Sequence, residues 1–148
     1  MKRRQAREIA LQALFQLDLN PGEPEKKAQY EQLAIDTAFA ELPDDVHIEG
    51  YEHEFVKDLV TGTRNHLEEI DAAIRKASKR WKLERMAVVD RNLIRMAIYE
   101  MRYADIPAEA PLAINEAVEL AKKYGTDDSH KYVNGILGTV VAHTDEAE

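Results

Sequence analysis

A chain of 148 residues with 45% hydrophobic and 32% charged residues suits one compact domain or two very small ones that stay dissolved. The absence of cysteine excludes disulfides, thiol catalysis and cysteine-ligated zinc, and it fits a reducing cytoplasm, where we expect the protein. The net charge of −8 argues against a nucleic-acid partner, but the N-terminal end holds Lys2, Arg3, Arg4 and Arg7 against Glu8 alone. A basic end on an acidic body concentrates a polyanion at one place, although a solvated, unstructured end has the same composition.

Helical periodicity dominates the chain and no alternating strand pattern is convincing, so the sequence predicts an all-α protein. In the first helix, apolar residues recur at i, i+3 and i+4 as far as Leu17, and Asn20-Pro21-Gly22 ends it. Three more helices are expected over about 25–41, 49–62 and 64–79. The stretch 79–82 reads as a joint, so we expect an N-terminal bundle over 1–80 and a C-terminal bundle over 81–148, joined as one compact unit.

The C-terminal half begins with a helix over about 85–103, whose apolar residues surround most of its circumference and predict a central position. Pro111 fits the first turn of the next helix, and Gly125 fits its C-terminal cap. The run from Thr126 to Ser129 supplies N-cap residues for the last helix, in which Gly135 and Gly138 predict a close helix contact.

The sequence carries no motif for catalysis, metal binding or nucleotide binding. The five histidines form no HExxH pair, and there is no phosphate-binding glycine loop and no serine nucleophile elbow. The many acids fall on solvent-facing helix positions, where a solvated face explains them better than acid–base catalysis. A helical adaptor for nucleic acid or protein is what remains, with no enzymatic reaction, cofactor or metal expected.

Two stretches of the sequence are distinctive. The first is RRQAREIALQALF over residues 3–15, and the second runs from VDRNLIRMAIYE at residue 89 through INEAVELAKKYG at 114–125 to DSHKYVNGIL at 128–137. Together these segments resemble the NusB family of transcription antitermination factors. The order and spacing of these segments match across the whole chain, most strongly over 3–17 and 86–137 and weakly over 20–60. No part of this chain could form a methyl-donor domain, so it is similar to the free-standing members rather than to those fused to RNA methyltransferases.

The resemblance implies a NusB-like fold of about seven helices in two small three-helix-like bundles. It also implies binding of boxA RNA together with NusE, a small-subunit ribosomal protein, in a complex with RNA polymerase and other Nus factors. Such a subunit promotes ribosomal RNA transcription and maturation without catalysing a reaction. Some relatives form homodimers that cover the RNA face, so a homodimer is a further expected assembly. The alternative is a non-catalytic protein-interaction scaffold that does not itself touch RNA.

Carried over to this sequence, the resemblance implies two sets of contact residues. The RNA-binding set is Lys2, Arg3, Arg4, Arg7, Gln12, Lys123, Tyr124, Asp128 and Lys131. The set facing NusE is Asp90 and Arg91, and the extent of that surface around residues 105–111 stays open.

Each assignment has a structural alternative. Gln12 could simply face water, and Tyr124 could fill the core, because it falls on the apolar stripe of its helix. Asp128 is expected to cap the last helix as well as to neighbour RNA. Asp90 and Arg91 could instead form a buried ion pair on the central helix.

Overall fold

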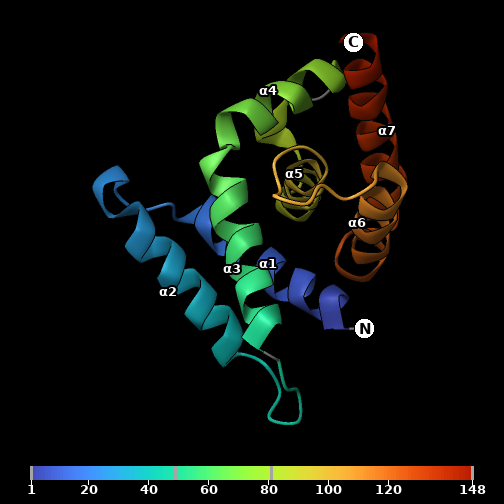
Figure 1. Ribbon diagram of the computed structural model, residues 1–148. Coiled ribbons are helices and arrows are strands. Elements are labelled where there is room, and N and C mark those ends of the chain that lie inside the picture. The colour runs from blue at the N-terminus through green and yellow to red at the C-terminus, as the bar shows by residue number, and fades with distance from the viewer. Residues whose placement is uncertain (1, 49, 81, 148) are drawn as a thin grey trace. The chain divides into compact units, whose positions relative to one another are not determined.

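The computed structural model describes residues 2–48, 50–80 and 82–147, apart from the side chains of Lys2 and of residues 144–147. Within those ranges the chain forms seven α-helices, two short 3-10 helices and no strand, which confirms the all-α prediction (Figure 1). The elements are α1 (Lys2–Leu19), η1 (Pro24–Lys26), α2 (Lys27–Ala40), α3 (Gly50–Asn65), α4 (Leu67–Ala77), η2 (Leu83–Arg85), α5 (Val88–Arg102), α6 (Ala110–Tyr124) and α7 (Ser129–Ala147).

The chain divides into two compact units, Met1–Arg64 and Asn65–Glu148. The sequence placed the division at residue 80, beside Trp81, which lies outside the described residues. The structure divides the chain earlier because α4 packs against α5 and α7 and so belongs to the second unit. The stretch 79–82 therefore connects two elements within one unit.

In the first unit, α1 packs against α2 along the apolar stripe that the sequence predicted. Ala6, Ala10, Ala13 and Leu14 are completely buried on this stripe, because residues three and four apart share a helix face. The rings of Phe39 and His53 stack at a centroid distance of 4.0 Å and bring the end of α2 to the start of α3.

In the second unit, α5 is the central helix, as its sequence predicted. Every residue from Asn92 to Glu100 is buried. Figure 1 shows α5 viewed down its axis, with α4 on one side of it and α6 and α7 on the other, and all three contact it. Because α7 packs against α5, the N-terminal turns of these two helices lie beside each other.

A buried bidentate ion pair joins α4 to α5. Arg95 donates from Nε to Oδ1 of Asp71 at 2.8 Å and from Nη2 to Oδ2 at 3.0 Å, and both residues are buried. The Nη1 group of Arg95 also donates to the side-chain oxygen of Asn92 at 3.4 Å. The buried ion pair of the central helix is therefore Asp71–Arg95, and the alternative pairing of Asp90 with Arg91 is wrong.

The glycines of α7 do not mark a close helix contact. A Cβ atom added to Gly135 or Gly138 would meet nothing within 4 Å, and both residues are exposed. The prediction failed because the two glycines lie beside the buried stripe of Val133, Leu137 and Val140 and not on it.

Candidate nucleic-acid interface

The basic residues at the start of α1 differ in their settings. Arg3 is exposed, Arg4 is half-buried and Arg7 is 5% exposed. The guanidinium carbons of Arg3 and Arg7 lie 4.5 Å and 5.4 Å from the centroid of the Phe55 ring on α3. The sequence treated the arginines alike, whereas the structure exposes Arg3 and packs Arg7 into the unit. Lys2 belongs to α1, but its side chain lies outside the described residues.

Gln12 lies further along α1 and is exposed. Its position on the polar side of α1 is the one the sequence predicted.

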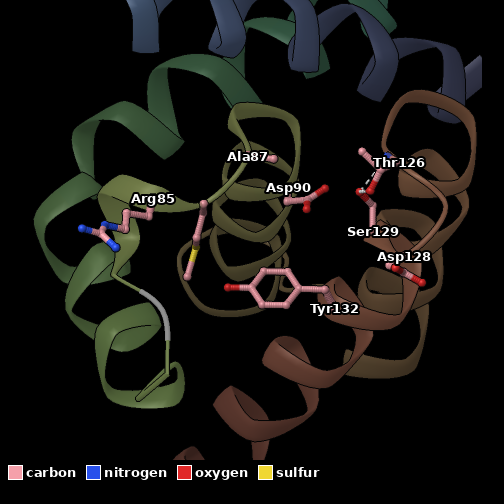
Figure 2. A pocket seen from close by; sticks show the side chains of 8 residues that line it. Arg85, Ala87, Asp90, Thr126, Asp128, Ser129 and Tyr132 are labelled. Carbon is pink, nitrogen blue, oxygen red and sulfur yellow. Dashed lines mark hydrogen bonds between the residues drawn. The ribbon is translucent and has the colours of Figure 1, made fainter.

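The second unit contains a cavity of about 270 Å³ between the start of α5 and the start of α7. Figure 2 shows Asp90 and Tyr132 pointing into it from α5 and α7, with Asp128 at its side. Met86 and Ala87 contribute apolar walls. The cavity therefore combines an apolar lining with polar groups that converge from two helices, as ligand sites commonly do.

Two polar atoms in this cavity are buried and have no hydrogen-bond partner among the described residues. They are Oδ1 of Asp90 and the hydroxyl of Tyr132. Burial raises the pKa of the Asp90 carboxyl, and a hydrogen bond with the Ser129 side chain opposes that rise. Because an unpaired buried polar group is costly, leaving these two atoms without a hydrogen-bond partner costs free energy.

The turn between α6 and α7 explains why Ser129 lies beside Asp90. The backbone N–H of Thr126 donates to Oγ of Ser129 at 2.9 Å, as Figure 2 shows. A Cβ atom on Gly125 would clash with the side chain of Ser129 and would lie 2.9 Å from the carbonyl oxygen of Ala121. Gly125 does cap α6, as predicted, but with φ −93° its role is to allow close approach and not a left-handed conformation.

Asp128 immediately precedes α7, yet the side chain that closes the turn is that of Ser129. The backbone carbonyl of Asp128 accepts from Tyr132 N at 3.2 Å. Asp128 lines the edge of the cavity, and its exposed carboxylate points away from Asp90 in Figure 2. Ser129 thus closes the turn that leads into α7 and does not cap the N–H groups of the helix itself. The carboxylate of Asp128 stays available to a ligand at the positive end of the α7 dipole.

Lys123 and Tyr124 end α6 with both side chains exposed. The Tyr124 side chain is 41% exposed, and Nζ of Lys123 lies 5.2 Å from the centroid of its ring. The core-filling alternative for Tyr124 is therefore wrong. Lys131, on the first turns of α7, is exposed as well.

The two residues expected to face NusE lie in different settings. Asp90 is buried and lines the cavity, whereas Arg91 is half-buried and donates from Nη1 to the Leu83 carbonyl oxygen at 3.0 Å. Asp90 and Asp128 thus line the same cavity. The sequence analysis did not single out Tyr132 as a cavity residue, and it considered Ser129 only within the run that supplies N-cap residues.

The described part of the chain contains no cluster of His, Asp or Glu able to hold a metal ion. None of its helices combines the length and the apolar character that crossing a membrane requires.

Comparison with known proteins identifies the family. Residues 4–142 match the model of the NusB family. The chain is 49% identical over 148 residues to the transcription antitermination protein NusB of Desulforamulus reducens, covering 99% of this chain and 94% of that protein.

Solved structures of NusB proteins also match this chain. T. maritima NusB matches with a TM-score of 0.79 and 30% identity, covering 96% of this chain and 92% of that one. A NusB from a complex of the antitermination factors NusB and NusE with double-stranded RNA matches with a TM-score of 0.74 and 25% identity, covering 96% and 97%. This chain belongs to the NusB family.

Proposed function

We propose that this chain is a transcription antitermination factor that binds boxA RNA together with NusE and so promotes ribosomal RNA transcription and maturation. The observation that carries the proposal is the match to NusB proteins over nearly the whole chain, including a NusB solved with NusE and RNA. The role is that of a non-catalytic scaffold in the cytoplasm, working with RNA polymerase and other Nus factors.

The RNA contacts are proposed from both units. In the first unit, Lys2, Arg3 and Arg4 pair with phosphates, because guanidinium and ammonium groups match phosphate oxygens. Gln12 lies further along the same helix and contacts a base. Arg7 contributes chiefly by holding Phe55 beneath Arg3.

In the second unit, the exposed ring of Tyr124 offers a stacking surface for an unpaired base, with Lys123 and Lys131 near the phosphates. The cavity at Asp90 is suited to the amino edge of a base, because the Asp90 carboxyl points into it and Asp128 lines its edge. Carboxylates accept from the amino groups of guanine, cytosine or adenine and repel phosphate, so this contact favours sequence recognition.

NusE is proposed to bind near the start of α5, beside Arg91. The side chain of Arg91 is half-buried, and its Nη1 group donates to the Leu83 carbonyl oxygen. This hydrogen bond holds the guanidinium group in one orientation toward a partner. Asp90 faces the cavity and influences NusE through the RNA that both proteins share.

A mobility shift with boxA RNA and with a scrambled RNA, each with and without NusE, tests the proposal. We expect selective, salt-sensitive binding of boxA that NusE strengthens. Asp128→Asn should change the ratio of boxA to scrambled binding while leaving the melting temperature unchanged, because Ser129 closes the turn.

The matched control is Asp127→Asn, which removes the same charge from an exposed residue that does not line the cavity. If the chain binds NusE but neither RNA in any condition, it is the protein-interaction scaffold instead.

A further inference from the structure

A second hollow lies on the surface of the second unit, along the line where α6 and α7 pack together. Its volume is about 500 Å³, and none of the residues that line it also lines the cavity at Asp90. On α6, Pro111, Ile114, Val118 and Lys122 share one face, because they recur at helical spacing. We call this hollow the α6–α7 groove.

The groove is basic on an acidic protein. Lys122 and Lys131 line it together with His130, and no carboxylate is among its lining residues. The whole chain carries 28 acidic against 20 basic residues, so this lining is the reverse of the average surface. The Nζ atom of Lys122 forms an ion pair with Oε1 of Glu119 at 3.3 Å. Lys131 is exposed at the groove. The groove thus attracts a negatively charged partner.

The rest of the lining favours a polypeptide over RNA. Pro111, Ile114 and Val118 give aliphatic surface, and the lining contains no Phe, Tyr or Trp on which bases could stack. The amides of Asn115 and Asn134 are exposed at the groove and can both donate to and accept from a peptide backbone.

We propose that the α6–α7 groove docks a segment of a protein partner that carries aliphatic side chains flanked by carboxylates. The aliphatic side chains lie against Ile114 and Val118, and the carboxylates pair with Lys122 and Lys131. An amphipathic helix laid between two helices is a recurring mode of this kind. This site is separate from the RNA contacts proposed above, apart from Lys131, which borders both.

A synthetic peptide with Leu and Glu at helical spacing serves as the probe, with the full chain labelled for amide NMR. We expect chemical-shift changes centred on Ile114, Asn115 and Asn134, and an affinity that falls with added salt. Lys122→Glu with Lys131→Glu should weaken binding about tenfold. Lys76→Glu with Lys79→Glu is the matched control, since both lysines are exposed and lie outside the groove. Peptides with Lys in place of Glu, or Ala in place of Leu, should not bind.

Each alternative gives a distinct result. Absence of shifts with the acidic peptide, or shifts that survive the groove variant, overturns the proposal. Oligouridylate that shifts the same groove amides identifies an RNA surface instead, and sedimentation showing a dimer that Lys122→Glu dissociates identifies a second copy of the chain. Binding of boxA RNA by Lys122→Glu is measured in parallel. If the variant binds boxA RNA but the parent does not bind the peptide, the groove proposal fails while the proposed function stands.

Discussion

Asp90 is a carboxyl group whose buried environment opposes its charge. Its pKa lies above the usual value of 3.8 because burial disfavours the carboxylate more than the Ser129 hydrogen bond favours it. The folded protein therefore binds a proton more tightly than the unfolded chain does. Stability is lost as the pH rises from 3.8 through the raised pKa, and the loss is complete above it.

Asp90→Asn should remove this charge penalty. We expect the variant to gain stability relative to the parent at pH 7 and the gain to shrink as the pH falls through the raised pKa to below 3.8, where Asp90 is protonated in both states. Urea unfolding at a series of pH values measures the difference. Asp128→Asn is the control, because its carboxylate is exposed. A stability difference that stays constant with pH would falsify this account of Asp90.

Arg3 and Arg7 give a second prediction at the level of single residues. Arg3 is exposed, so Arg3→Ala should weaken RNA binding and reduce the single-strand salt slope by about 0.7, with an unchanged melting temperature. Arg7 is buried against Phe55, so Arg7→Ala should cost about 1–3 kcal/mol of folding free energy, because it leaves buried groups without their contacts. Replacing Arg3, Arg4 and Arg7 together would mix the loss of RNA contacts with the loss of stability.

Salt titrations of RNA binding and thermal unfolding, performed on the two single variants, separate them. Phe55→Leu extends the test, because it keeps an apolar side chain and removes the ring beneath Arg3. It should weaken RNA binding less than Arg3→Ala does. Equal stability losses in Arg3→Ala and Arg7→Ala would contradict the distinction between them.

Between elements, the Asp71–Arg95 pair fixes α4 against α5. Asp71→Ala should destabilise the protein by about 3–5 kcal/mol, because it leaves the buried Arg95 guanidinium without its bidentate partner. Replacing both residues, as in Asp71→Leu with Arg95→Met, should restore most of the stability, since no charge is then buried alone. Urea denaturation of the parent, each single variant and the double variant forms the cycle. A double variant less stable than Asp71→Ala contradicts this explanation.

Element ends were predictable from the sequence because their signals are local. Asn20-Pro21-Gly22 and Pro111 stand where α1 ends and α6 begins, since proline and glycine act on the backbone at their own positions. Asp71 and Arg95 are 24 residues apart, and no local pattern identifies one as the partner of the other. The sequence left open whether Tyr124 is exposed or fills the core, for a related reason. A stripe shows which face turns inward but not where the neighbouring helix stops covering it.

The cavity at Asp90 was only partly predictable. Asp90 and Asp128 were both singled out by family resemblance, but they were assigned to different partners because their distance in sequence hid their closeness in space. Tyr132 was not singled out, because periodicity cannot show that a tyrosine hydroxyl reaches a cavity. Sequence therefore identified chemically relevant residues, and the packing of α5 against α7 was needed to group them.

For the whole molecule, we predict that RNA and NusE bind with positive coupling. The exposed cations at the start of α1 are few, and the chain as a whole has a net charge of −8, so RNA binding by this chain alone should be weak. A second protein that touches the same RNA adds contacts without adding the entropy cost of a separate encounter. Typical coupling free energies of about 1–3 kcal/mol correspond to roughly 5–150-fold in affinity.

Calorimetry of each pair, with the third component present or absent, measures this coupling. Because coupling is reciprocal, the factor by which NusE tightens boxA binding must equal the factor by which boxA tightens NusE binding. Scrambled RNA should show little coupling, and Asp128→Asn should reduce it if base recognition at the cavity holds the RNA in register. Arg3→Ala is the matched comparison: loss of one phosphate contact should weaken boxA binding both with and without NusE, by similar factors, and leave the coupling nearly intact. Equal affinities in the presence and absence of the third component would mean that the two ligands bind independently. The RNA would then not be shared between this chain and NusE.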